Sequence, residues 1–90
     1  MRWVKGVKCL EEYVLELCFD NGERRRVDLR PHLSGEIFEP LKDVQYFRQV
    51  VVNTDIDTIV WPNNADFSPD FLYEISESLT EVAKPAKNNN

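Results

Sequence analysis

Alternation of apolar and polar residues predicts strands in the first third of the chain. Residues 13–19 alternate most clearly, residues 3–10 are β-leaning, and residues 23–29 follow a strong turn signal. Gly6 falls inside the first of these segments, where glycine weakens pairing or marks a bulge. The pattern therefore predicts an antiparallel meander of three strands.

The turn at residues 20–22 decides how the second and third strands align. A two-residue loop would bring arginine side chains onto the apolar face of the hairpin. A three-residue loop, with Gly22 in the left-handed conformation and a bulge, instead groups Val27 and Leu29 with the apolar residues of the second strand. The other face then pairs Glu16 with Arg26, a favourable cross-strand pair. We therefore expect the bulged turn.

The middle of the chain predicts a loop followed by a short helix. Pro31 ends the third strand, and Gly35 permits a sharp reversal of the backbone. Asp43 is placed to cap a helix through residues 45–48, because an aspartate there accepts the free amide hydrogens of the first turn. Three apolar residues that precede this cap are expected in the core: Ile37, Phe38 and Leu41.

A second hairpin and a final helix complete the pattern. Residues 50–52 and 58–61 read as paired strands with a turn at residues 55–57. The Ser-Pro-Asp run at residues 68–70 is a helix start, with a serine cap, proline in the first turn and an acid at the positive end. An apolar stripe with helical spacing follows, at Phe71, Leu72, Ile75 and Leu79.

These elements predict an α+β fold in the order β-β-β-(short α)-β-β-α. Antiparallel hairpins need one face covered, and the C-terminal helix is the obvious cover, which makes a small two-layer domain. We expect one domain over residues 1–82. Residues 83–90 are polar and lysine-rich, and we expect a disordered tail there.

Charge narrows the classes of partner. The formal net charge is −5, and it is unevenly distributed: residues 1–48 carry nine basic and nine acidic groups, whereas residues 49–90 carry two and seven. Phosphate contacts need clustered lysine and arginine, so direct nucleic-acid binding is not expected. The run Arg24-Arg25-Arg26 does not change this, because alternation along a strand divides it between two faces.

The chain shows no export or membrane signal. Charge and glycine interrupt the N-terminus before an apolar run develops, and no stretch approaches the length of a membrane span. Cys9 and Cys18 lack metal-ligand spacing and are expected as reduced thiols. We therefore expect a cytoplasmic protein without a cofactor.

The segment Trp61-Pro62-Asn63-Asn64-Ala65-Asp66 is the main candidate binding site. An exposed aromatic beside asparagine and aspartate, leading into a helix N-terminus, suits a partner's backbone or a small anionic group. The alternative is that Trp61 is a core residue and that Asn63 and Asp66 satisfy their own turn. Asp28 and Arg30 would join a polar site with Asp66 if the two loops meet in space, or else they only fix the exit of the third strand.

Catalytic and metal chemistry are weakly supported. Asp55, Asp57, Asp66 and Asp70 could offer oxygen ligands to a divalent cation, but turns and helix caps account for each of them. His32, the single histidine, has no nucleophile or orienting group near it in sequence. A ligand- or metal-dependent enzyme using His32 with Asp28 and Asp66 therefore stays a secondary hypothesis.

Three blocks of sequence resemble the bacterial family called domain of unknown function 2442. They are Leu15-Glu16-Leu17-Cys18-Phe19-Asp20-Asn21-Gly22-Glu23, then Val27-Asp28-Leu29-Arg30-Pro31, then Ile59-Val60-Trp61-Pro62-Asn63-Asn64-Ala65-Asp66-Phe67-Ser68-Pro69-Asp70-Phe71-Leu72-Tyr73. The family usually has glycine where this chain has Asn64. The resemblance therefore implies a positive φ at Asn64, which asparagine tolerates best after glycine.

What this resemblance implies about function is limited. Family members look like small α+β domains without an established activity. Some longer relatives append a helix-turn-helix domain, which we do not expect in this chain, and some are encoded beside small toxin-like proteins. We expect a non-enzymatic protein-interaction or regulatory module. An antitoxin-like partner of a small toxin-like protein and a homodimer joined by unpaired strand edges are the alternatives.

Overall fold

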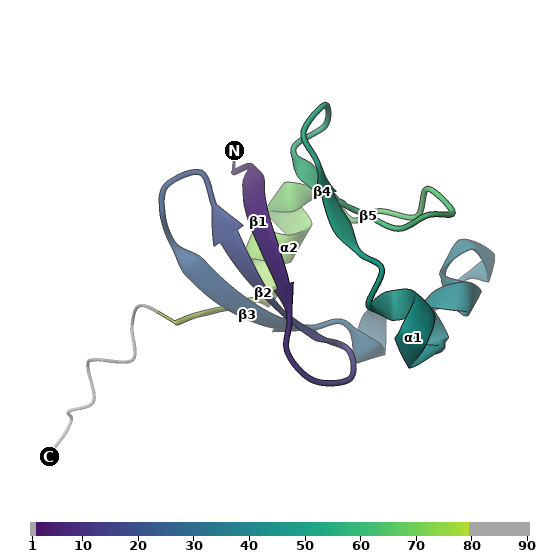
Figure 1. Ribbon diagram of the computed structural model, residues 1–90. Coiled ribbons are helices and arrows are strands. Elements are labelled where there is room, and N and C mark those ends of the chain that lie inside the picture. The colour runs from purple at the N-terminus through teal and green to yellow at the C-terminus, as the bar shows by residue number, and fades with distance from the viewer. Residues whose placement is uncertain (1, 80–90) are drawn as a thin grey trace, which may run out of the picture.

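A computed structural model, described over residues 2–79, shows two antiparallel sheets with helices packed against them (Figure 1). The larger sheet has the order β1-β2-β3-β6 and the smaller one pairs β4 with β5. The strands are β1 (Val4–Cys9), β2 (Val14–Phe19), β3 (Arg24–Asp28), β4 (Val51–Asn53), β5 (Thr58–Val60) and β6 (Glu77–Ser78). The helices are α1 (Val44–Phe47) and α2 (Pro69–Ile75), with short 3-10 helices η1 (Arg30–His32) and η2 (Glu36–Lys42). The predicted α+β fold and the order of its elements are confirmed.

The bulged turn between β2 and β3 is also confirmed. Gly22 has φ 85°, and β2 pairs with β3 so that Leu15 lies opposite Val27 and Glu16 opposite Arg26. The register of β1 on β2 shifts between Val4 and Gly6, which is the irregularity that glycine predicted there. Because this register is kept, Leu15, Leu17 and Phe19 of β2 all face the core.

β1 also joins the larger sheet to the smaller one. The Val4 amide donates a hydrogen bond of 2.9 Å to the Asp57 carbonyl, and β1 packs beside both β4 and β5. The predicted loop around Pro31 contains the 3-10 turn η1. Asp43 caps α1 as expected, since its carboxylate accepts a hydrogen bond from the Gln45 amide.

Helix α2 begins as predicted but ends earlier. The Ser68 hydroxyl accepts a hydrogen bond from the Phe71 amide, and the helix runs only to Ile75. Ser76 is extended and buried, and its hydroxyl and carbonyl both accept hydrogen bonds from Arg25 of β3. The chain therefore leaves the helix to form β6 along β3. The prediction that Leu79 belongs to the helical stripe is wrong, because its amide instead bonds to the Arg24 carbonyl.

One hydrophobic core lies between the sheets and the helices. Figure 1 shows α2 behind the face of the β1-β2-β3 sheet, which gives the two layers. Leu41 is fully buried and Phe38 packs against the core, as predicted. Ile37 was expected there too, but it is 49% exposed because η2 turns it outward. No helix within residues 2–79 has the length and apolar character needed to cross a membrane. The predicted tail at 83–90, and the end of the predicted domain, lie outside the described residues.

Candidate functional site

Trp61 is a core residue. Its side chain is 1% exposed, and its indole N–H donates a hydrogen bond of 2.9 Å to the Phe47 carbonyl. The indole ring also packs against the rings of Phe47 and Phe67, with centroids 5.4 Å and 6.0 Å away. The hypothesis of an exposed aromatic anchor at Trp61 is therefore wrong, and the alternative that Trp61 is core is confirmed.

The rest of the turn is held by its own polar groups. Asn64 has φ 69°, the positive value implied by the resemblance, and its amide bonds to the Trp61 carbonyl at 2.8 Å. Asn63 accepts a hydrogen bond from the Ala65 amide at 3.1 Å and donates one to the Ile37 carbonyl at 2.9 Å. Asn63 thus ties the turn to η2. These contacts hold the turn in place, and both polar atoms of the Asn63 side-chain amide are already hydrogen-bonded within the protein.

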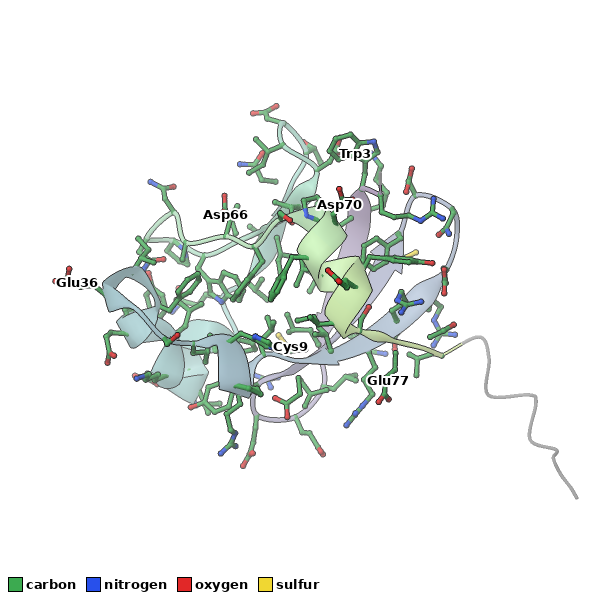
Figure 2. The ribbon with its side chains drawn as sticks, turned by 180° about the vertical axis from the view of Figure 1, so that it is seen from behind. Trp3, Cys9, Glu36, Asp66, Asp70 and Glu77 are labelled. Carbon is green, nitrogen blue, oxygen red and sulfur yellow. The ribbon has the colours of Figure 1, made fainter. Side chains whose placement is uncertain are left out.

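Asp66 is exposed, whereas the residues on either side of it, Ala65 and Phe67, are buried. Its backbone is bridged to Val60, and Val60 lies opposite Val51 in the β4–β5 ladder. Directly opposed residues of antiparallel strands share one face, so Val51, Val60 and Asp66 form a row across the hairpin. We call these three residues the outer row. Figure 2 shows Asp66 pointing away from the body of the molecule.

The outer row exposes apolar surface as well as charge. Val51 is 55% exposed and Val60 half-buried, whereas Ile59, on the opposite face of the hairpin, is fully buried. The sequence pattern predicted a strand at residues 50–52 but not the exposure of Val51. The signal was present, because consecutive valines in a strand must alternate between the core and the outside.

Asp28 and Arg30 make contacts that differ from those of Asp66. The Asp28 carboxylate accepts a hydrogen bond of 3.0 Å from the Arg30 amide, which fixes the start of η1. The Arg30 guanidinium pairs with Glu12 and lies over the Tyr13 ring, 5.0 Å from its centroid. These contacts agree with the alternative that Asp28 and Arg30 fix the path of the chain where it leaves β3.

The residues considered for metal and catalysis make other contacts. Asp57 pairs with Lys5 at 3.0 Å, and Asp70 accepts a hydrogen bond from the Arg2 amide. Over residues 2–79, no group of three or more His, Cys, Asp or Glu side chains is arranged to hold a metal ion. The His32 ring packs edge-on against Phe71, with centroids 5.3 Å apart.

The uncovered face of the larger sheet carries charges that compensate one another. Lys8 lies opposite Glu16, Glu16 opposite Arg26, and Arg26 opposite Glu77, so the sign alternates across four strands. Arg24 adds an ion pair to Glu16 at 2.8 Å, and this hydrogen bond lowers the pKa of Glu16. We call the five residues of this arrangement the charge ladder.

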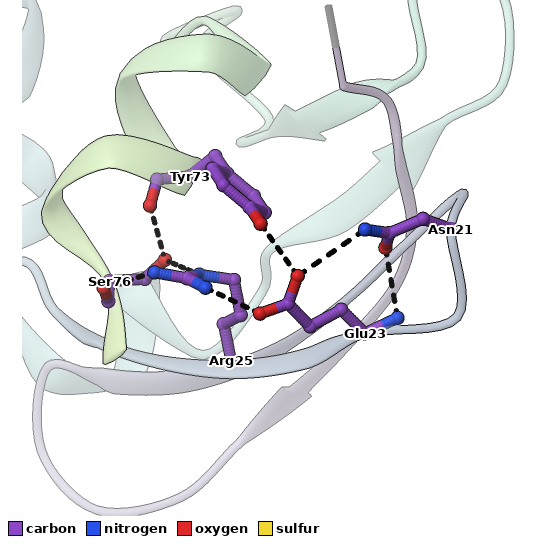
Figure 3. Close-up of polar contacts among 5 residues, drawn as sticks. All are labelled: Asn21, Glu23, Arg25, Tyr73 and Ser76. Carbon is purple, nitrogen blue, oxygen red and sulfur yellow. Dashed lines mark hydrogen bonds and ion pairs between the residues drawn. The ribbon is translucent and has the colours of Figure 1, made fainter. Parts of the chain in front are cut away.

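A second polar network joins the β2–β3 hairpin to α2 (Figure 3). Glu23 accepts hydrogen bonds from the Tyr73 hydroxyl and from Arg25, both at 2.6 Å. These bonds, that from Tyr73 first, lower the pKa of Glu23 from 4.5 to about 2. Arg25 also lies over the Tyr73 ring at 4.1 Å and bonds to Ser76. Sequence reasoning missed this network because its two halves are about fifty residues apart.

Comparison with known proteins places the chain in a family. A solved structure from Nitrosomonas europaea, named "Putative DNA Binding Protein", superposes with a TM-score of 0.74 at 22% sequence identity. The match covers 83% of this chain and 48% of that one, so this chain spans about half the length of its relative, and the likeness shows the fold alone. No curated protein matches significantly. The model of the "Protein of unknown function (DUF2442)" family matches residues 4–78, and the chain belongs to that family.

Proposed function

We propose that this protein is a non-enzymatic interaction module that binds a protein partner through the outer row, Val51, Val60 and Asp66. The observation that carries the proposal is the exposure of Val51, which lies beside the half-buried Val60 and in register with the exposed carboxylate of Asp66. Exposed apolar positions grouped beside a polar rim are typical of protein-binding surfaces. The turn that follows β5 supports the row, because its own polar contacts fix where Asp66 lies.

The charge ladder argues against nucleic acid as the direct partner. Its three cations each lie beside one of two carboxylates on neighbouring strands, so the face offers phosphates an excess of only one positive charge. The name of the Nitrosomonas europaea protein refers to DNA binding, but the match covers less than half of that chain. The proposal for this chain is a protein partner.

An enzymatic role is the weaker proposal. His32 contacts the Phe71 ring, and the Asp28 carboxylate is bonded to the Arg30 amide. Neither contact is part of a nucleophile–base pair, which is the arrangement that acid–base or nucleophilic chemistry requires. We further propose that the module works in the cytoplasm, which the two free cysteines support.

Site-specific photo-crosslinking tests the proposal. A benzophenone amino acid is placed at Val51 in one variant and at Lys8, on the charge ladder, in a matched control. Both variants are expressed in the native cell and irradiated. One adduct with a different protein at position 51, absent from position 8, is the expected result, and mass spectrometry identifies the partner, including a small toxin-like one. Equal adducts at both positions, or only an adduct of the chain with itself, would contradict it.

A further inference from the structure

The tips of two hairpins, the start of β1 and the start of α2 meet at one end of the molecule. The Trp3 amide donates to the Asp20 carboxylate at 3.1 Å, and the Asp20 amide donates to the Trp3 carbonyl at 2.9 Å. The next amide, that of Val4, bonds to Asp57 in the β4–β5 turn. The Arg2 amide bonds to Asp70 in the first turn of α2. Figure 2 shows Trp3 and Asp70 close together at this end.

Two large apolar side chains are exposed there. Trp3 is 37% exposed, unlike Trp61, and Ile56 at the tip of the β4–β5 hairpin is 45% exposed. The backbone bond between Val4 and Asp57 brings the residues next to them, Trp3 and Ile56, to the same end. An exposed indole and an exposed isoleucine at the same end are costly in water, so we regard the pair as a contact surface.

Four aspartates lie at the same end of the molecule as this apolar pair. Asp20, Asp55, Asp57 and Asp70 all lie in the segments that meet at this end. The cations nearest to Trp3 in sequence are Arg2 and Lys5. The Lys5 ammonium already pairs with Asp57. Residues 49–79 contain no lysine or arginine, so every charged side chain of the β4–β5 hairpin and of α2 is acidic. We call Trp3, Ile56 and these four aspartates the strand-tip surface.

We propose that the strand-tip surface binds a cationic, partly apolar segment of a partner protein, with an arginine or lysine side chain lying on the Trp3 indole. Three features agree on this chemistry. The face of an indole attracts cations more strongly than the other aromatic rings do. The carboxylates at the same end supply complementary charge for further basic residues. Ile56 offers an apolar contact to residues between them. The inference rests on the proposed function, since it names the chemical class of the partner.

Fluorescence quenching tests the local charge without any partner. The Trp3→Phe variant reports Trp61 alone, so its signal can be subtracted from that of the wild-type chain. We expect Trp3 to be quenched more by caesium than by iodide, relative to free N-acetyltryptophanamide. An Asp20→Asn/Asp55→Asn variant should reduce that preference. Equal quenching by the two ions would overturn the acidic surface.

Peptide binding tests the recognised chemistry. The probes are a twelve-residue peptide of alternating arginine and leucine and its glutamate–leucine counterpart, followed by anisotropy of a label on the peptide. We expect binding of the first only, weakened about ten-fold or more by Trp3→Ala, as for a central aromatic contact. Asp55→Asn should weaken it about two- to five-fold, as for an exposed ion pair. Because Trp3 and Asp55 are exposed, both variants should keep the wild-type circular dichroism spectrum.

The outcomes separate this inference from the proposed function. Failure of the cationic peptide to bind, equal binding of both peptides, or unchanged affinity in Trp3→Ala would overturn the strand-tip proposal. A partner adduct at Val51 would then still support the interaction module. Conversely, peptide binding without any adduct at Val51 would support the strand-tip surface and contradict the outer row.

Discussion

The two sheets of this protein differ in how far their surface side chains are paired with one another. In the larger sheet, the charge ladder sets each charge beside an opposite one, and the network around Glu23 and Arg25 holds the hairpin to α2. In the smaller sheet, Val51 and Asp66 are exposed on the outer face. The larger sheet therefore balances its charges within itself, whereas the smaller sheet leaves Val51 and Asp66 exposed, which is why the proposed outer row lies there.

The largest effect should come from removing the residue that anchors the smaller sheet. Trp61→Ala deletes a buried ring and its hydrogen bond to Phe47. We expect a loss of about 3–5 kcal/mol in the free energy of unfolding, which for a domain of this size leaves little folded protein. Urea denaturation followed by circular dichroism measures it. A melting curve close to that of the wild type would mean that Trp61 is not part of the core.

The next largest loss of stability should distinguish two adjacent arginines, Arg24 and Arg25, which lie on opposite faces of β3. Arg25→Ala removes the bonds to Glu23 and Ser76 in a mostly buried network, and we expect a loss of about 2 kcal/mol. Arg24→Ala removes a largely exposed ion pair and should cost about 0–1 kcal/mol. Denaturation of both variants in the same buffer provides the measurement. Equal losses would show that the network contributes no more than the charge ladder.

Acid should weaken the larger sheet through Glu23. Its pKa in the folded protein is about 2, lowered from 4.5, so folding favours the ionised carboxylate. The stabilisation is therefore complete above the unfolded pKa and is lost as the pH falls through 4.5 towards 2. Urea midpoints across this range should fall more steeply for the wild type than for Glu23→Gln. Parallel curves would show that Glu23 is not held in its ionised form.

The smallest effect on stability should come from the outer row. Val51→Thr changes an exposed side chain, so the free energy of unfolding should stay within about 0.5 kcal/mol of the wild type. The neighbouring variant Val52→Thr places a hydroxyl on the side that packs against the core and should cost about 1 kcal/mol or more. Thermal denaturation compares the two. A larger loss for Val51→Thr would assign that side chain to the core and remove it from the proposed binding surface.

Local signals predicted most of the fold. The turn around Gly22 fixed the register of the hairpin, and Asp43 and Ser68 marked both helix starts, because each signal acts within a few residues. The end of α2 was missed because helical spacing continues to Leu79. Where the helix ends, Ser76 is extended and accepts hydrogen bonds from Arg25, which lies on a strand fifty-one residues away in sequence.

The candidate site was harder to predict for a related reason. A tryptophan beside asparagine and aspartate has the same local pattern whether its ring is exposed or buried, and here the Phe47 carbonyl accepts its N–H from a distant helix. The exposure of Val51 and Trp3 depends on which faces the two sheets leave uncovered. That is a property of the packing of whole elements, and a linear pattern does not determine it.

The placement of the two thiols has a practical consequence. Cys18 lies opposite Gly6, on the uncovered face of the larger sheet, whereas Cys9 lies opposite Leu15 and packs against the core. A disulfide within the chain would require β1 and β2 to separate, because the two side chains point to opposite sides of adjoining strands. Alkylation rates at Cys18 and Cys9 should therefore report independently on the uncovered face of the sheet and on the side that packs against the core.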